Sequence, residues 1–290
     1  MQNNSKNGKK HPGLGNSNKI KVLMYHIVTD DKSFCSKNRN IAVHVSEFRN
    51  QMKFLDRCGF VTITFEDYLL YMNGELNLPK KPIILSFDDG FADVHQYAFP
   101  ILQEFGMRAV LFILGDRKIK TNSWDHASGI SPKPLLADYQ IIEMHDAGFE
   151  IGSHALTHSK LTNIQREKAW EEISRSRMLL EIFLNTQVKS IAYPFGSVNK
   201  TLKILAEEAG YQIGCGSYSG PLVFGKDRFE IHRINIPGQL TIFQFALRLS
   251  RLHHYLEWTW WRLMKNGKIN KNRLSVFSSS KGEIQNNNYH

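Results

Sequence analysis

Two adjacent carboxylates end an apolar run and are followed by a glycine, as Asp88-Asp89-Gly90 after residues 83–87. The run is typical of a buried strand in a parallel sheet, since both faces of such a strand are covered. Carboxylates can take a proton from water or bind a cation, and ligand chemistry collects at the carboxyl ends of parallel strands. Neighbouring side chains on a strand point to opposite sides, so the two carboxylates need not share one role unless the strand has ended. An ordinary Asp-Gly turn is the alternative interpretation.

Two histidines four residues apart, His154 and His158, directly follow a second expected strand at 149–152. Imidazole is the commonest side-chain ligand of metal ions, although a pair of structural histidines is the simpler interpretation of the spacing alone. In a parallel barrel all strand ends converge on one face, which would bring this pair to Asp88 and Asp89. One carboxylate with two imidazoles is a common ligand set for a divalent metal that keeps positions open for water and substrate.

A third strand end carries the sequence Tyr193-Pro194-Phe195-Gly196. Proline and glycine on either side of an aromatic residue favour a fixed, exposed turn. Such a turn can direct a backbone N–H into a cavity, where it would stabilise an oxyanion. An ordinary loop between a strand and a helix is the alternative.

These strand ends need a framework in which strands and helices alternate. Apolar runs predict strands at 20–28, 60–63, 83–87, 109–114, 149–152, 188–193, 211–215 and 228–236. Helical spacing and capping residues predict helices at 46–59, 64–73, 92–105, 137–147, 164–184 and 199–209. The alternation predicts an α/β fold with a parallel sheet, and about seven or eight strands in roughly 220 residues favour a closed or nearly closed barrel. The irregular segment 115–134 is long enough for a functional loop, and Trp124 and Asp125 within it are candidate substrate contacts.

The chain has 290 residues, of which 42% are hydrophobic and 22% charged, as expected for a globular protein of one large or two small domains. Its formal net charge of +10 comes largely from basic residues near the two ends. No nucleic-acid-binding motif accompanies them, so we expect no nucleic acid partner. Three cysteines, Cys35, Cys58 and Cys215, have the spacing of neither a zinc knuckle nor a disulfide framework.

The two ends of the chain differ in composition from its middle. Residues 1–18 and 265–290 are polar and predict disordered tails around one domain at 19–238. The first 18 residues lack the apolar core of a secretory signal, and no apolar run is long enough to span a bilayer. This pattern predicts a cytoplasmic location.

Residues 239–264 combine apolar side chains near one helical face with basic residues and three tryptophans. This composition predicts a helix, and two positions for that helix are compatible with it. The helix packs across the barrel, or it rests on a membrane surface with tryptophan at the interface and basic side chains toward anionic lipid. The second position would make the protein peripheral at the membrane.

The three strand-end motifs together resemble those of the NodB-type polysaccharide deacetylases, carbohydrate esterase family 4. The matching stretches are Phe-Asp-Asp-Gly at 87–90, His-x-x-x-His at 154–158 and Tyr-Pro-Phe-Gly at 193–196, in the family's order, and the similarity covers residues 20–237. The resemblance implies a distorted (β/α)7–8 barrel that holds a divalent ion, usually zinc and sometimes cobalt or nickel. It implies that Asp89, His154 and His158 bind the metal and that Asp88 is the general base.

The family's last motif, Leu-x-x-His, supplies a general acid and usually lies near the C-terminus. In this chain the match is at residues 23–26, which makes His26 the implied acid. This arrangement resembles the circularly permuted branch that includes the poly-N-acetylglucosamine deacetylases.

Two positions depart from the family pattern. Many members carry an arginine near the third motif that orients the catalytic aspartate, and residues 190–192 are Ser-Ile-Ala instead. Arg233 on the expected strand at 228–236 is a candidate replacement, with a purely structural arginine as the alternative. Phe195 stands where the family usually has tyrosine, a change that is tolerable if only its backbone N–H is used.

The resemblance therefore implies a metal-dependent hydrolase that removes N-acetyl groups from an amino-sugar glycan or a lipid-linked amino sugar. Its expected partner is an N-acetylated glycan or glycolipid. Two alternatives stay open. One is another C–N hydrolase on the same barrel, which would open cyclic amides or imides. The other is a catalytically silent carbohydrate-binding relative, which would have no need for a base beside a metal.

Overall fold

A parallel sheet of eight strands forms the centre of the computed structural model, which describes residues 19–250 and Thr259. The strand order is β10-β1-β5-β6-β7-β8-β9, and β4 pairs with β5 outside this path. Every neighbouring pair in this sheet is parallel. The strands are β1 (Lys21–Tyr25), β4 (Val61–Thr62), β5 (Pro82–Phe87), β6 (Val110–Ile113), β7 (Glu150–Ser153), β8 (Ser190–Ala192), β9 (Ile213–Cys215) and β10 (Ile234–Asn235).

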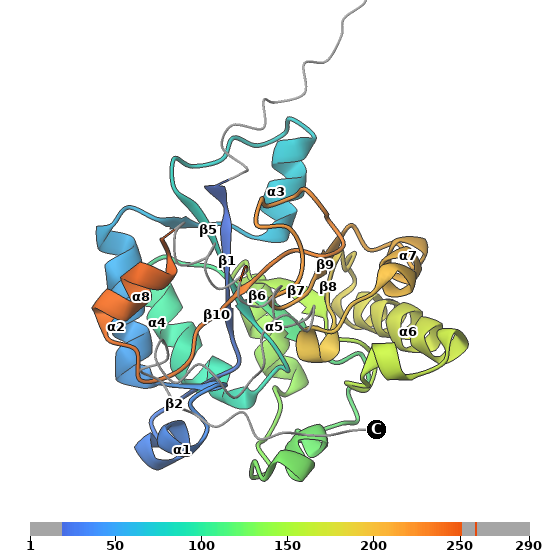
Figure 1. Ribbon diagram of the computed structural model, residues 1–290, viewed down its shortest axis with the longest axis horizontal. Coiled ribbons are helices and arrows are strands. Elements are labelled where there is room, and N and C mark those ends of the chain that lie inside the picture. The colour runs from blue at the N-terminus through green and yellow to red at the C-terminus, as the bar shows by residue number, and fades with distance from the viewer. Residues whose placement is uncertain (1–18, 251–258, 260–290) are drawn as a thin grey trace, which may run out of the picture.

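Helices surround the sheet, with α2, α4 and α8 on the left of Figure 1, α6 and α7 on the right, and α3 at the top. They are α1 (Lys32–Lys37), α2 (Val45–Arg57), α3 (Phe65–Met72), α4 (Phe99–Glu104), α5 (Asp138–Asp146), α6 (Arg166–Leu184), α7 (Lys200–Glu208) and α8 (Ile242–Arg248). Shorter helical turns are η2 (Val94–Ala98), η3 (Ser123–Ser128), η4 (Leu161–Asn163) and η5 (Pro194–Gly196). A separate two-stranded parallel sheet consists of β2 (Ile27–Thr29) and β3 (Ala42–His44).

The segment before β10 closes the curled sheet. Ile231 forms a parallel bridge with Cys215 at the end of β9, while β10 pairs with β1. The ring is distorted at β5, because β4 pairs with its first residues and β6 with its last residues along the same edge. The predicted distorted (β/α) barrel is therefore confirmed.

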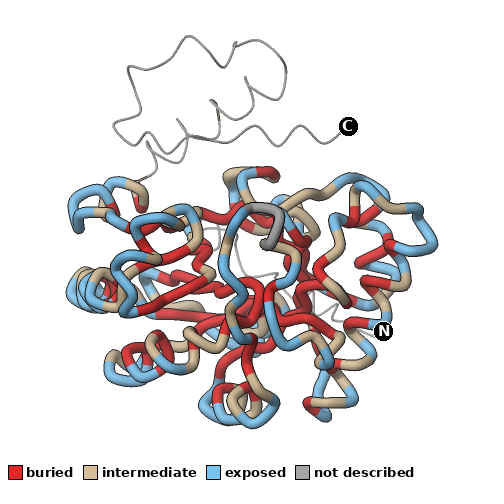
Figure 2. The backbone as a smooth tube through the Cα atoms, turned by 90° about the horizontal axis from the view of Figure 1, so that it is seen from below, coloured by how far each residue is buried: buried red, intermediate tan, exposed pale blue. Residues whose placement is uncertain are grey.

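The side chains of β5 alternate between the surrounding helices and the interior of the barrel, up to the two carboxylates that follow the strand. Ile83, Leu85 and Phe87 pack in the core cluster that includes residues of α2 and α4. Ile84 belongs to the second cluster, inside the barrel. Ser86 lies two residues further along on this inner face, as expected for the period of a strand. Figure 2 shows buried segments across the centre of the molecule and exposed segments around its rim.

Several element boundaries differ from those predicted. The expected strand at 20–28 is interrupted at His26, and its second part, β2, pairs with β3 instead of the barrel sheet. Helix α1 was not predicted; Asp31 caps it by accepting the Phe34 N–H at 2.8 Å. The expected strand at 228–236 is reduced to β10 and the bridge at Ile231.

The predicted helix at 239–264 is represented by α8, which packs on α2. Phe245 and Leu249 are buried, and the ring of Phe245 meets that of Phe54 edge to face at 5.9 Å. The rest of that segment beyond Ser250, apart from Thr259, and the predicted tails at 1–18 and 265–290 lie outside the described residues. Within the described part of the chain, no helix has the length and apolar character needed to cross a membrane.

The buried Glu150 at the start of β7 predicts a pH-dependent stability. Burial, with the nearby charge of Glu66 as a second cause, raises the pKa of Glu150 from 4.5 to about 7. The folded state therefore binds this proton more tightly than the unfolded state. The resulting stabilisation of the folded state is present below pH 4.5 and is lost as the pH rises through about 7. Glu150→Gln should reduce the loss of unfolding free energy between about pH 5 and 8 by an amount on the order of 2 kcal/mol.

Urea unfolding at the two pH values measures this difference. The glutamine side chain of the variant keeps an acceptor for the Glu66 N–H, which donates to Glu150 at 2.9 Å in the wild type. Parallel pH dependence in the two proteins would show that Glu150 is ionised in the folded state throughout.

Candidate active site

The residues predicted from four strand ends meet in one cavity at the carboxyl-terminal edge of the sheet. Its volume is about 250 Å³. The predicted residues that line it are His26 after β1, Asp88 and Asp89 after β5, His154 and His158 after β7, and Phe195 and Gly196 after β8. The convergence follows from the parallel sheet, because all strand ends lie on the same side.

Asp89, His154 and His158 direct one ligand atom each to a common point. All three side chains are buried, and these ligand atoms lie within 4.8 Å of one another. Asp89 Oδ1 is 3.1 Å from Nε2 of each imidazole. His154 Nδ1–H donates to the Ala192 carbonyl at 2.8 Å, which leaves the Nε2 lone pair available to a metal. This donor set fits a divalent ion such as Zn²⁺, Co²⁺ or Ni²⁺.

Unusual backbone geometry brings these ligands together. Asp89, Ala155, His158 and Phe195 have φ between 60° and 70°, the left-handed region that non-glycine residues rarely adopt. Residues in such conformations cost about 1–3 kcal/mol each and cluster at functional sites, where the surroundings hold them. At Asp89, the left-handed turn ends the alternation of β5, so both carboxylates reach the same cavity.

Asp88 forms a buried, two-pronged ion pair with Arg233. The two guanidinium nitrogens of Arg233 lie 2.6 and 2.7 Å from the two carboxylate oxygens, and Arg233 is fully buried. Arg233 Nε–H also donates to the Gly216 carbonyl at 2.7 Å. Burial alone would raise the pKa of Asp88, but the charge and hydrogen bonds of Arg233, together with the nearby imidazoles of His154 and His26, hold the pKa below its ordinary value. Asp88 therefore stays ionised while lying next to the three converging ligands.

Aromatic rings hold His158 from two sides. The Trp124 ring stacks on it at 4.3 Å between centroids, and the Phe195 ring meets it edge to face at 4.7 Å. Nδ1 of His158 is buried and has no hydrogen-bond partner among the described residues. Nδ1 of His26 is likewise buried and without such a partner. His158 is therefore oriented by packing and by its backbone, unlike His154.

The remaining predicted residues divide into two groups. Trp124 and Asp125 line the cavity, and Asp125 accepts a hydrogen bond from Asn122 Nδ2 at 2.9 Å. Burial raises the pKa of Asp125; the Asn122 bond opposes this shift and the charge of Asp89 adds to it. Tyr193 and Pro194 are buried but do not line the cavity. In that motif, the structure places only Phe195 and Gly196 at the cavity wall.

The sequence did not single out six further residues that line the cavity. Two follow or end late strands, because Ser217 comes after β9 and Asn235 ends β10, so their strand-end position was the signal available. Met24 lies within the match at residues 23–26, at a variable position of that motif, and the other three have no distinguishing pattern in the sequence. The complete added set is Met24, Asn40, Ile41, Ser217, Tyr218 and Asn235.

Known proteins with similar sequences carry deacetylase names. The profile of the polysaccharide deacetylase family matches residues 75–214. YxkH of Bacillus subtilis, named as a polysaccharide deacetylase, is 28% identical over 221 residues, which cover 76% of this chain and 72% of that protein. The poly-β-1,6-N-acetyl-D-glucosamine N-deacetylase of Staphylococcus aureus is 26% identical over 207 residues, 68% of this chain and 69% of that protein.

A solved structure shows the same fold. The deacetylase PplD of Streptococcus pyogenes, determined in complex with acetate, superposes with a TM-score of 0.67 at 24% identity. The match covers 80% of this chain and 98% of that one. Together with the motifs and the barrel, the family profile and the named relatives make this chain similar to the polysaccharide deacetylases.

Proposed function

We propose that this protein is a metal-dependent N-deacetylase acting on an N-acetylated amino-sugar glycan. The observation that carries the proposal is the buried group of Asp89, His154 and His158 beside a separate carboxylate, Asp88, that pairs with Arg233. A divalent ion held by the first three residues would act as a Lewis acid and lower the pKa of a water molecule. A binding module has no need for the additional ionised carboxylate.

The protein residues then divide the proton transfers. Asp88 takes a proton from the attacking water, since each of its oxygens keeps a lone pair beyond its bond to Arg233. His26 lines the same cavity and donates a proton to the departing amine, which is a poor leaving group unless protonated. The backbone N–H of Phe195 stabilises the oxyanion; the next two N–H groups of that turn, of Gly196 and Ser197, donate to carbonyls within it.

The cavity suits a single sugar residue of a longer glycan. Its volume of about 250 Å³ is below the roughly 300–1,000 Å³ of pockets that enclose drug-sized ligands. Phe195 and Tyr218 at its edge are exposed aromatic residues that can stack on the apolar face of a pyranose. The S. aureus relative is named for poly-N-acetylglucosamine, and we propose a substrate of that class. A cyclic amide or imide is the alternative to be separated by a substrate panel.

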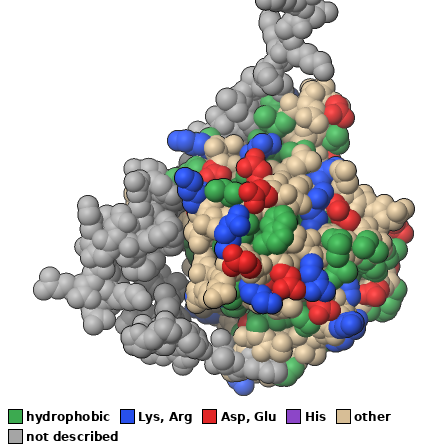
Figure 3. Space-filling model, turned by 90° about the vertical axis from the view of Figure 1, so that its right-hand side faces the viewer, with side chains coloured by type: hydrophobic (Ala, Val, Ile, Leu, Met, Phe, Trp, Pro, Cys, Tyr) green, Lys and Arg blue, Asp and Glu red, His purple; other side chains and the backbone are tan. Residues whose placement is uncertain are grey.

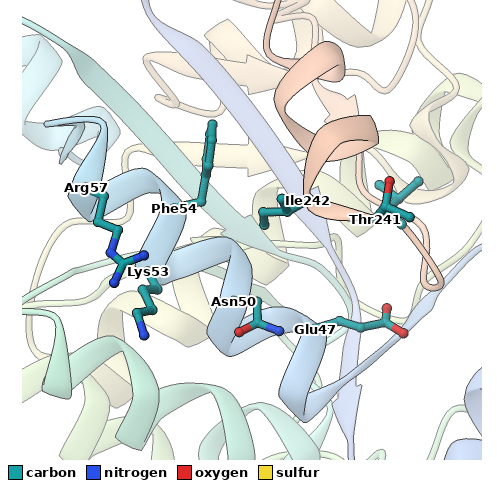
Figure 4. Close-up of a pocket in the computed structure, with 8 residues that line it drawn as sticks. Glu47, Asn50, Lys53, Phe54, Arg57, Thr241 and Ile242 are labelled. Carbon is teal, nitrogen blue, oxygen red and sulfur yellow. The ribbon is translucent and has the colours of Figure 1, made fainter.

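We also propose that the chain contacts an anionic membrane surface through α8 and the segment that follows it. Ile242, Phe243 and Leu247 of α8 are exposed, with Phe243 at 74%. Beside them, α2 and α8 border a groove of about 500 Å³ whose lining includes Lys53 and Arg57 (Figure 4). Exposed apolar groups flanked by basic side chains suit an interface with anionic lipid.

The first prediction concerns the base. Asp88→Asn should lower kcat by about 10²–10⁴-fold, because the amide cannot accept the proton, while bound metal is retained. Acetate release from N-acetylglucosamine oligomers, with elemental analysis of the same samples, measures both effects. Asp125→Asn is the matched comparison, since it removes another carboxylate from the same cavity wall without touching the Arg233 pair. A loss of this size in the Asp125 variant, with activity kept in Asp88→Asn, would move the assignment of the base to Asp125.

The second prediction concerns the ligand set. Asp89→Ala should reduce bound zinc after dialysis from near stoichiometric to near zero, because two neutral imidazoles alone bind the ion much more weakly. Circular dichroism controls for folding. A dialysed variant that kept its zinc would place the metal elsewhere and contradict the assignment of Asp89.

The third prediction concerns the membrane. Phe243→Ser should weaken sedimentation with phosphatidylglycerol-containing vesicles several-fold, by removing apolar area from the interface. Ile182→Ser is the control, since Ile182 is 71% exposed but lies on α6. Equal binding by both variants and the wild type would remove α8 from the proposed interface.

A further inference from the structure

The loop between the two histidine ligands is held from outside the cavity by helix α6. The carboxylate of Glu172 accepts the backbone N–H of Leu156 at 3.0 Å and that of Thr157 at 2.9 Å. It also accepts the hydroxyl of Thr157 at 2.5 Å and that of Ser159 at 3.2 Å. One nearly buried side chain thus binds four donors on the segment that carries His158.

This loop needs such support because its backbone is unfavourable on its own. Ala155 and His158 have φ of 62° and 67°, and each left-handed residue costs about 1–3 kcal/mol unless its surroundings over-determine it. Hydrogen bonds to a charged acceptor are roughly twice as strong as neutral ones. The Glu172 carboxylate therefore offsets strain located between the two metal ligands.

A second anchor lies one helical turn further along α6. Ser176 Oγ donates to the Ala155 carbonyl at 2.9 Å and lies 2.7 Å from Ser153 Oγ. The helix comes close here, since a Cβ on Gly115 would lie only 2.5 Å from Ser176 Cα. Ser176 thus holds the start of the loop and Glu172 its end.

The two ligands depend on the loop to different degrees. The ring of His154 is oriented by the Ala192 carbonyl on β8. His158 has no such bond at Nδ1 among the described residues, so the position of its Nε2 depends on ring packing and on the path of its own backbone. That path is what Glu172 holds.

We propose that Glu172 is a positioning residue for the metal centre: it fixes the 155–159 backbone and thereby sets the distance from His158 Nε2 to Asp89. The proposal rests on the proposed metal site. Glu172 does not line the cavity, so it touches neither substrate nor ion. Its removal should weaken metal binding more than it slows the metal-saturated enzyme.

Glu172→Gln tests this directly, because the amide replaces an acceptor oxygen with a donor that faces N–H and O–H groups. In the full chain, stripped of metal with a chelator, we expect Zn²⁺ affinity to fall by about 10–100-fold, measured by competition with a chromophoric chelator. The visible spectrum of the Co²⁺ form should change as well. Acetate release should recover largely at saturating Zn²⁺.

The control is Glu171→Gln on the same helix. Glu171 pairs with Lys168 and Arg175 of α6. The side of the molecule on which α6 and α7 lie carries interspersed acidic and basic side chains (Figure 3). The Zn²⁺ affinity of the Glu171 variant should stay within about twofold of wild type, as for most surface ion pairs. If Glu172→Gln fails to fold, Thr157→Val removes a single bond to the carboxylate at similar volume and should weaken Zn²⁺ binding by about threefold to tenfold.

Unchanged Zn²⁺ affinity in a folded Glu172→Gln, or in Thr157→Val if the former does not fold, would overturn the positioning role. So would equal losses in the Glu171 and Glu172 variants. Selective loss of affinity in a protein that releases no acetate from any glycan would support the role of Glu172 and reject only the deacetylase proposal.

Discussion

The buried ion pair between Asp88 and Arg233 is the constraint on which the rest of the site depends. A buried charge without a partner is strongly destabilising. The fold can therefore bury Asp88 and Arg233 only if it places the two side chains in contact. Arg233 also binds the Gly216 carbonyl after β9, and its guanidinium lies 5.5 Å from the ring centre of Phe112 on β6. One interaction therefore links β5, the end of β9 and the segment that closes the barrel, and it keeps an ionised carboxylate beside Asp89, His154 and His158.

Closure of the ring also explains how His26, the proposed general acid, can come from the first strand. The last strand, β10, pairs with β1, and β1 pairs with β5. A histidine placed after β1 therefore reaches the same cavity as Asp88 and Asp89, even though the related motif usually lies near the other end of the chain. Position along the sequence matters less than position around the ring, since all parallel strand ends share one face.

Most of the fold and the central site could be predicted from the chain. Buried parallel strands leave continuous apolar runs such as 83–87, and the residues that directly follow them are recognisable as site candidates. The short elements and turns outside the central sheet were harder to predict. Helix α1 depends on the Asp31 cap and the burial of Cys35, and β2 leaves the barrel sheet to pair with β3. Tyr193 and Pro194 share a motif with Phe195 but do not reach the cavity, because the turn directs them elsewhere.

The sequence by itself determined the alternation of strands and helices and the kinds of side chain at three strand ends, because burial and side-chain chemistry are local properties of the residues. Only the tertiary structure decided which charges pair and how the ligands are held. Arg233 meets Asp88 from 145 positions away, and Glu172 supports the histidine loop from a neighbouring helix. Such contacts depend on the packing of distant segments, which no spacing within the chain encodes.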